Sequence, residues 1–318
     1  MSTNAPSTAV TLTLAHSADA DDVFMWWPIT GKVDPASPER VLSPAVLDTH
    51  GIRFISVPED ISKLNQRAVA VGDLDITAVS FATLPRIWDR YAPTVCGSSF
   101  GDDWGPKLVR QGQRPEITLE SIRSAAADGR RYRLAIPGRG TTAWACLCSV
   151  LGSAESFEIV ETPFDQIVGK VAAGIADLGL LIHESQLTFQ NAGLAALMDL
   201  GVEFKRRHGL PLPLGSNAVR RDLDSRFGAG TLQRVVDLLD ASIRFALAHR
   251  AESLEYARTF SPLKDDATLD RYITLYVNKY TVDARPDGVK AARIMLGAAA
   301  DLGVVPRIEM FEMLDPTR

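Results

Sequence analysis

The sequence has few of the residues that build disulfide frameworks or structural metal sites. Three cysteines and five histidines occur among its 318 residues, and neither type shows the clustered spacing of a zinc site. Cys146 and Cys148 are better explained as part of a buried helix face than as metal ligands. We therefore expect a protein with reduced thiols and without a structural metal.

Basic patches and long apolar runs are missing too. The net charge is −5 at pH 7, and no basic run is interleaved with aromatic residues, which argues against nucleic acid as a partner. No apolar run approaches the roughly 20 residues that span a bilayer. The N-terminal stretch MSTNAPSTAVTLTLAHSADADD has neither the basic start nor the apolar core of a secretory signal. These absences predict a cytoplasmic protein without a membrane partner, and nothing in the sequence indicates its oligomeric state.

Strand and helix signals alternate along two stretches of the chain and predict an α/β fold. The predicted strands cover residues 11–15, 52–57, 76–81, 132–136, 157–160 and 176–182. Helical periodicity follows most of these strands, and it continues without further strands from Leu232 onward. The alternation predicts parallel strands joined by crossover helices.

The length of the chain predicts two lobes, because single cores stop growing at roughly 250–300 residues. No low-complexity linker separates the two α/β stretches, so the lobes should pack around a cleft. We expect a discontinuous first lobe of residues 10–112 and 212–318, which includes the C-terminal helices, and a second lobe of residues 113–211. The glycine-rich residues 97–106 lack the lysine of a P-loop and predict a mobile loop or a crossover between lobes. The proline-stiffened residues 209–215 predict a fixed connection between them.

The run LGLLIHESQL, residues 178–187, ends an apolar strand in His183 and Glu184. Ligands of open α/β sheets bind at the carboxyl ends of strands, and a neutral imidazole there can act as a general base near pH 7. Glu184 either orients this histidine or faces solvent. A half-exposed histidine in a strand-to-loop turn explains the same dipeptide, and the local pattern by itself favours that interpretation.

Two further segments place polar side chains where helices begin. In PGRGTT, residues 137–142, Thr141 and Thr142 follow a glycine turn, and free N–H groups at a helix start form an anion site. N-capping by Thr141 is the simpler explanation, and both can hold together. Ser80, at the end of its strand, has the same ambiguity. The three aspartates of residues 17–22 fit a cap for a helix that begins near Val23, with a cation site as the alternative.

Five stretches of the sequence, taken in order, resemble one known family. They are AIPGRGTTA, LGLLIHESQLTF, MDLG, HGLPLPLG and LYVNKYTVD. Together they resemble 1,4-dihydroxy-6-naphthoate synthase, a late enzyme of the futalosine route to menaquinone, from about Leu12 to beyond Gly303. The resemblance implies a cytoplasmic enzyme with the type II periplasmic-binding-protein fold, in which two α/β lobes enclose a cleft.

The same resemblance implies a reaction and a set of site residues. The reaction is that of a carbon–carbon lyase, which converts cyclic dehypoxanthine futalosine, a small carboxylate, into 1,4-dihydroxy-6-naphthoate without a metal or organic cofactor. The histidine that is the family's catalytic base corresponds to His183. The tandem threonines that contact substrate correspond to Thr141 and Thr142, and a substrate-contacting serine corresponds to Ser80.

The sequence also departs from the family, and two other functions compete. Residues 17–24 read SADADDVF where the family has SPCPNDTF, so Asp22 is kept while Asp21 replaces asparagine and the cysteine is absent. Residues 35–49 resemble an insertion. The first alternative is a chorismate dehydratase of the same pathway, in which we expect a strand tip with aspartate rather than His183. The second is a non-catalytic organic-anion-binding module of the same fold, which needs no base.

Overall fold

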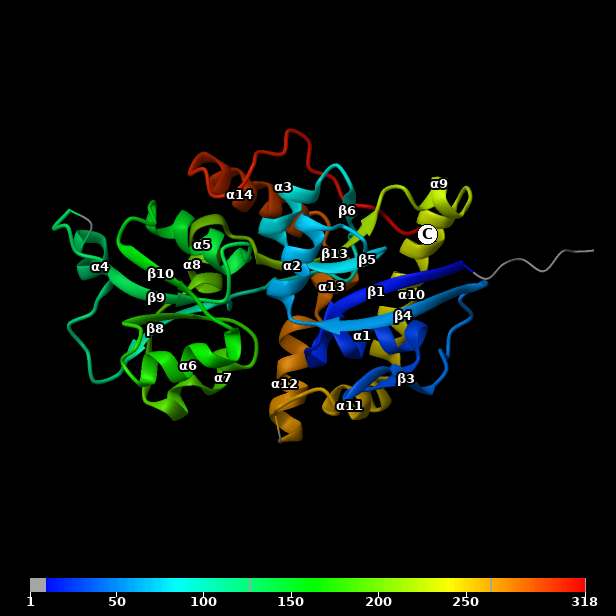
Figure 1. The fold of residues 1–318 in the computed structure, drawn as a ribbon, viewed down its shortest axis with the longest axis horizontal. Helices are drawn as coiled ribbons and strands as arrows, with labels where there is room; N and C mark the ends of the chain where they lie inside the picture. Colours follow the sequence, from blue (N-terminus) through cyan, green and yellow to red (C-terminus); the bar gives the residue numbers. More distant parts are fainter. Residues whose placement is uncertain (1–9, 126, 264, 318) are drawn as a thin grey trace, which may run out of the picture.

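The computed structural model describes residues 10–125, 127–263 and 265–317, which form two α/β lobes side by side (Figure 1). The first lobe contains a sheet with the strand order β4-β1-β5-β13-β6, and β7 pairs with β13. Its strands are β1 (Val10–Ser17), β4 (Ile52–Glu59), β5 (Ile76–Ser80), β6 (Tyr91–Pro93), β7 (Ser99–Gly101) and β13 (Leu212–Arg220). This arrangement confirms the predicted two-lobed α/β class.

The second lobe contains a sheet with the order β10-β9-β11-β8-β12. Its strands are β8 (Lys107–Gln111), β9 (Tyr132–Ile136), β10 (Phe157–Glu161), β11 (Leu178–Leu181) and β12 (Leu194–Asp199). A separate hairpin of β2 (Lys32–Asp34) and β3 (Ser37–Ser43) occupies much of the predicted insertion.

The expectation of parallel strands is correct for the six predicted strands, whereas two strands that follow the lobe crossings were not predicted and are antiparallel. β1 runs parallel to β4 and β5, and β9 runs parallel to β10 and β11. By contrast, β13 is antiparallel to β5, and β8 is antiparallel to β11. Each of them enters its sheet at the carboxyl end of a parallel strand, since Gly215 pairs with Ser80 and Lys107 with Leu181. A chain that arrives at that edge can only run back through the sheet.

The chain crosses between the sheets twice, after β7 and after α8. Both predicted connections, residues 97–106 and 209–215, lie at these crossings. The first crossing comes earlier than the boundary predicted after residue 112, because β8 belongs to the second sheet. The polar residues that follow β8 mark no lobe boundary, since Leu108 and Val109 are already fully buried in the second lobe.

Helices cover both sheets, and their ends follow local capping signals. The helices are α1 (Ala20–Thr30), α2 (Ile61–Ala70), α3 (Leu84–Ile87), α4 (Leu119–Ala125), α5 (Thr142–Leu151), α6 (Phe164–Ala172), α7 (Ser185–Thr188), α8 (Leu200–His208), α9 (Leu223–Phe227), α10 (Thr231–Ala248), α11 (Arg250–Arg258), α12 (Asp266–Tyr276), α13 (Lys279–Val282) and α14 (Asp287–Asp301), with the short 3-10 helices η1 (Phe81–Thr83) and η2 (Phe189–Ala192). The Asp60 carboxylate accepts hydrogen bonds from two N–H groups at the start of α2. α5 lies between Thr141 and the left-handed Gly152, as the sequence predicts.

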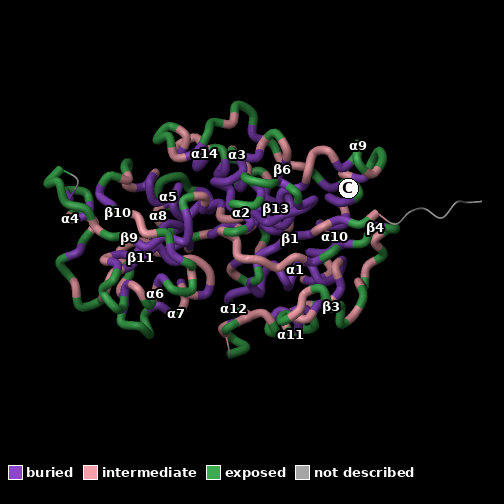
Figure 2. The backbone as a smooth tube through the Cα atoms, in the orientation of Figure 1, coloured by how far each residue is buried: buried purple, intermediate pink, exposed green. Residues whose placement is uncertain are grey.

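Buried residues concentrate along the sheets and between the two lobes (Figure 2). One apolar cluster contains residues of both sheets, including Val79 and Leu134, together with Met295 of α14. α14 packs against α5 on one side and β13 on the other, so this C-terminal helix joins the lobes through shared core. Within the described ranges, no helix is both long and apolar enough for a membrane span.

Candidate active site

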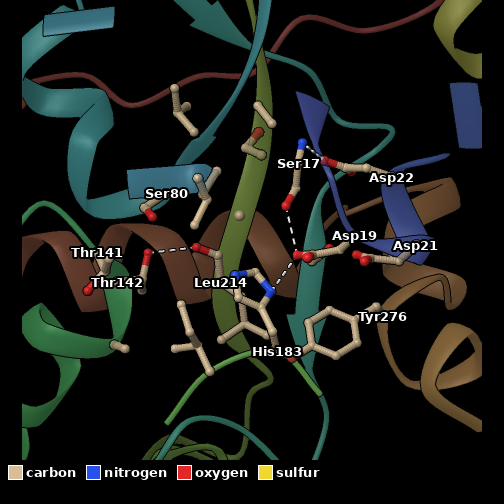
Figure 3. Close-up of a pocket in the computed structure, with 18 of the residues that line it drawn as sticks. Ser17, Asp19, Asp21, Asp22, Ser80, Thr141, Thr142, His183, Leu214 and Tyr276 are labelled. Carbon is tan, nitrogen blue, oxygen red and sulfur yellow. Dashed lines mark hydrogen bonds and ion pairs between the residues drawn. The ribbon is translucent and has the colours of Figure 1, made fainter. Parts of the chain in front are cut away.

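A pocket lies where strands of the two sheets end, and it is lined from both lobes (Figure 3). All four residues singled out from the sequence line it: Ser80, Thr141, Thr142 and His183. Ser80 ends β5 of the first sheet, His183 follows β11 of the second, and the two threonines stand at the start of α5. The structure thus brings together four side chains from three separate stretches of chain, while the chemical role of each remains a prediction.

His183 is held tightly and in an uncommon backbone conformation. Its φ angle of 54° is left-handed, which costs a non-glycine residue roughly 1–2 kcal/mol. Its side chain is 13% exposed, so the interpretation as a half-exposed loop histidine is wrong. Nδ1 lies 2.6 Å from Oδ2 of Asp19, whereas Nε2 is buried without a hydrogen-bond partner among the described residues. Strained backbone and an unpaired polar atom at one residue indicate a functional site.

Asp19 is the partner that sequence reasoning missed. It precedes α1, which begins at Ala20 rather than near Val23, and its side chain caps no helical N–H group. The carboxylate instead accepts a hydrogen bond of 2.7 Å from the Ser17 hydroxyl and pairs with His183. The predicted capping role of the aspartates is therefore wrong for Asp19. Its partner comes from the other sheet, so no local pattern reveals it.

The charge on His183 differs from the expected neutral imidazole. Burial by itself lowers the pKa of His183, but the charge and hydrogen bond of Asp19, helped by Glu184 and Asp21, outweigh burial and raise that pKa to about 9. Burial likewise raises the pKa of Asp19, but the charge and hydrogen bond of His183 reverse the effect and leave it lowered. These pKa shifts favour an ion pair between the two side chains at neutral pH.

The neighbouring acidic side chains, Asp21, Asp22 and Glu184, are buried beside the negative charge of Asp19. Burial, followed by the charge of Asp19, raises the pKa values of Asp21 and Glu184 to about 7 each. Burial and the charge of Asp21 also raise the pKa of Asp22 well above its ordinary value. Glu184 is 6% exposed, so it does not face solvent, and Asp19 rather than Glu184 contacts the imidazole. Asp21 and Glu184 are therefore partly protonated near neutral pH and can donate hydrogen bonds.

The three aspartates of residues 17–22 have different partners rather than a common centre. Asp22 accepts a hydrogen bond of 2.6 Å from the Ser17 N–H group, and Asp21 accepts one of 3.1 Å from the Tyr272 hydroxyl. Asp19 pairs with His183. Within residues 10–125, 127–263 and 265–317, no group of three or more potential ligands is arranged to hold a metal ion. The geometry of these acids supports an orienting role.

The hydroxyls at the start of α5 are already hydrogen-bonded. Thr141 Oγ1 donates to the Gly138 carbonyl at 2.7 Å and accepts from the Trp144 N–H group, which is plain N-capping. Thr142 Oγ1 donates to the Leu214 carbonyl of β13 at 2.6 Å. The N–H groups in the first turn of α5 have no preceding helical carbonyl to bind. An anion can therefore bind these N–H groups and the positive end of the helix dipole, while the Thr142 hydroxyl joins the lobes.

Two amide side chains support the predicted site residues. Asn65 of α2 accepts from the Ser80 N–H group at 2.8 Å and donates to Ser80 Oγ at 3.0 Å, which leaves the serine hydroxyl hydrogen available to a ligand. The Gln186 amide satisfies both of its ends in the orientation in which its oxygen accepts from the His183 N–H group at 3.2 Å and from the Tyr276 hydroxyl at 2.7 Å. Its amide nitrogen then donates to the Gly105 carbonyl in the first lobe crossing. Gln186 thereby holds the backbone turn that carries the histidine.

The fold and the pocket place the protein in the class of two-lobed, periplasmic-binding-protein-like α/β proteins. The alkanesulfonate-binding protein SsuA of Xanthomonas axonopodis pv. citri, bound to MOPS, has a similar fold, with a TM-score of 0.61, 14% identity and 95% and 96% of the two chains covered. A structure from Archaeoglobus fulgidus is more alike, with a TM-score of 0.75 and 31% identity over 93% of this chain and 98% of the other.

Sequence comparison defines the family within that class. The chain belongs to the menaquinone biosynthesis family, whose model matches residues 12–301. It is 35% identical to the 1,4-dihydroxy-6-naphtoate synthase of Streptomyces coelicolor, over 94% of this chain and 96% of the relative. It is 33% identical to the enzyme of that name from Thermus thermophilus, over 91% and 94%. These relatives confirm the resemblance found in the motifs and support an enzyme of menaquinone biosynthesis.

Proposed function

We propose that this protein is a 1,4-dihydroxy-6-naphthoate synthase, a carbon–carbon lyase that acts on cyclic dehypoxanthine futalosine. The observation that carries the proposal is Nε2 of His183, which has no hydrogen-bond partner in the described part of the chain and is buried at a pocket lined from both lobes. Family membership supplies the substrate, and the pocket supplies a candidate base. The start of α5 on another wall suits the substrate carboxylate.

In the proposed mechanism, His183 acts as the general base. The neutral imidazole takes a proton from the substrate through Nε2, and the electron pair left behind forms a double bond in one fragment as the carbon–carbon bond breaks. The electrons of the broken bond stay on the departing fragment, which takes up a proton. Asp19 holds Nδ1 at 2.6 Å and stabilises the imidazolium that forms. A base positioned in this way contributes on the order of 100- to 10,000-fold to the rate.

The other pocket residues bind and orient the substrate. The Ser80 hydroxyl, held by Asn65, can donate its hydrogen to a substrate oxygen. The N–H groups of Thr142 and Ala143 form the carboxylate site. Because Asp21 has a pKa of about 7, its protonated form is a second donor on the opposite wall. Together these groups fix the substrate relative to His183 before proton transfer.

The ion pair itself favours one alternative, an organic-anion-binding module without turnover. A protein that holds an imidazolium beside a helix start is well suited to bind an anion, and the fold is shared with the alkanesulfonate-binding protein SsuA. Incubation with cyclic dehypoxanthine futalosine, followed by chromatographic detection of 1,4-dihydroxy-6-naphthoate, separates the two functions. Product that forms catalytically with the native chain, and not with His183→Asn, supports the lyase. Saturable binding without product supports the binding module and refutes the lyase.

A further inference from the structure

One ion pair in the pocket joins two segments that are far apart in the sequence. Asp19 follows β1 of the first sheet, and His183 follows β11 of the second. Their side chains are 9% and 13% exposed, and Oδ2 lies 2.6 Å from Nδ1. Figure 3 shows the histidine ring pointing toward Asp19, which in turn accepts a hydrogen bond from the Ser17 hydroxyl. A residue of the same lobe thus orients the Asp19 carboxylate, which also pairs with the histidine of the other lobe.

We propose that Asp19 is a positioning residue for His183, which holds the base in its reactive orientation only when the two lobes are closed. This inference rests on the proposed function of His183 as a base. Asp19 accepts the Nδ1 hydrogen and thereby selects the tautomer whose Nε2 lone pair is free for the substrate. The Ser17 hydroxyl orients the carboxylate in turn.

The second lobe alone leaves the imidazole ring incompletely fixed. Within that lobe, the Phe164 ring lies edge-on to the imidazole, with 4.7 Å between ring centroids. That contact is apolar and does not distinguish Nδ1 from Nε2. Gln186 holds the backbone N–H group of His183 but not its ring. The hydrogen bond that selects one ring nitrogen comes from the first lobe.

The coupling to closure follows from other contacts around the pocket. Ser62 Oγ donates to the Pro137 carbonyl at 2.9 Å, and Thr83 Oγ1 donates to the Gly140 carbonyl at 3.0 Å. Both bonds join the first lobe to the turn before α5, so they form and break with the same motion. Separation of the lobes removes Asp19 from Nδ1 and releases the ring, which confines the oriented base to the closed state.

The groups around His183 determine how its protonation responds to this pairing. The titratable or charged groups that face it or line the adjoining groove are Asp19, Asp21 and Asp22 at the start of α1, Glu184 beside it, Tyr272, Tyr276 and Arg271 of α12, and Lys107 of β8, which pairs with Asp199. Burial opposes the charged imidazole, and Asp19 contributes more than any other group to raising the pKa of His183. Removal of the Asp19 charge should therefore lower the pKa of His183 strongly.

The decisive variant is Asp19→Asn in the intact chain. We expect kcat at its high-pH plateau to fall on the order of 10- to 100-fold, because a misoriented base loses part of its contribution, while KM changes little. The acidic limb of the kcat/KM profile should move from about pH 9 toward about 6.5, the ordinary value for histidine. Asp19→Glu retains the charge and should retain the high-pH limb, with a lower rate. An unmoved limb and unchanged kcat in Asp19→Asn would overturn the proposal.

A matched control separates positioning from loss of a buried carboxylate. Asp75 directly precedes β5, whereas Ser80 ends that strand, and Asp75 is 5% exposed. Its carboxylate accepts a hydrogen bond from Thr13 and pairs with Arg226 at 2.6 Å. Asp75→Asn should lower stability without moving the pH profile. If Asp75→Asn moved the limb as Asp19→Asn does, the effect would be structural and the positioning role would be refuted.

A second measurement needs no turnover and keeps the two proposals apart. NMR titration of the five histidines, with His183 assigned by loss of its signals in His183→Asn, reports its midpoint and tautomer directly. We expect Asp19→Asn to lower the midpoint and change the tautomer. If the native chain forms no product, the proposed lyase function fails, and the titration still decides whether Asp19 orients His183. An identical midpoint and tautomer in both proteins refutes the positioning role even if turnover is found.

Discussion

Two strand-to-helix turns meet across the pocket, and they differ in how completely their polar atoms are satisfied. In the turn after β1, Asp19 and Asp22 both bind Ser17, and Asp21 accepts from Tyr272. In the turn after β11, His183 has a left-handed backbone, and both His183 Nε2 and Glu184 Oε1 lack partners among the described residues. The aspartates of the first turn thus have hydrogen-bond partners. The second turn combines a strained backbone with polar atoms that lack partners among the described residues. That contrast favours the second turn as the place of the proposed base, while the first turn supports it.

The largest effect should follow from removing the reactive group of the strained turn. His183→Asn keeps a similar shape but has no proton affinity in the relevant range, so kcat should fall at least ~100-fold while substrate binding changes little. Single-turnover kinetics and calorimetric binding with the same substrate measure the two quantities separately. Native turnover in His183→Asn would place the base elsewhere and remove the functional contrast between the turns.

The pH dependence of the native protein tests the partnership between the turns. The base must be neutral, and Asp19 raises the pKa of His183 to about 9 against the opposing effect of burial. kcat/KM should therefore rise about tenfold from pH 7 to 8 and then level off as the pH passes 9, because only the neutral fraction reacts. A profile that is flat above about pH 6.5 would mean that the ion pair does not persist in the active enzyme.

The pocket shows how far sequence reasoning reaches and where it stops. α5 and β9 match their predicted bounds closely, because caps and apolar alternation are local signals. The reversed directions of β8 and β13 depend on where the chain re-enters each sheet, which no local pattern encodes. Sequence periodicity therefore predicted the parallel strands of both sheets, whereas it missed the antiparallel strands β8 and β13.

The same limit applies to the site. His183 was found through the resemblance, because its dipeptide alone is a weak signal. Asp19 was missed, since its partner lies on another sheet. Asn65 was missed although it left a trace, as a polar residue on the apolar face of α2 beside Leu64 and Ala68, where it binds Ser80. A buried amide on an apolar helix face was thus the one local signal available for a supporting residue.

Stability should also depend on pH, because the pKa shifts in the two turns act in the same direction. The folded-state pKa of His183 is raised to about 9, so its contribution is fully present below about pH 6.5 and is lost as pH rises through 9. Asp21 and Glu184 have folded-state pKa values raised to about 7, so folding also becomes less favourable as pH rises from about 4 to 7. Asp19, whose pKa is lowered, acts only in more acidic solution.

We therefore expect the free energy of unfolding to decrease by several kcal/mol between pH 5 and pH 9, at roughly 1.4 kcal/mol per unit of pKa shift. Urea unfolding at a series of pH values measures this change. Asp19→Asn should remove most of the decline above pH 7, whereas the control Asp75→Asn should keep it. A stability that rises from pH 5 to 9 would contradict the buried cluster of acids and imidazole.

The smallest effect on function should come from substitution of Thr142, whose hydroxyl already donates a hydrogen bond between the lobes. Thr142→Val keeps the branched shape but leaves the Leu214 carbonyl without its donor at 2.6 Å, which costs roughly 1–3 kcal/mol. Part of that cost should appear as loss of lobe closure, so substrate affinity, measured in a His183→Asn background, should fall about three- to tenfold. Thr141→Ser keeps its cap and should bind like the parent. Unchanged affinity with lowered stability in Thr142→Val would show that this bond holds the fold together but does not contribute to closing the pocket over the substrate.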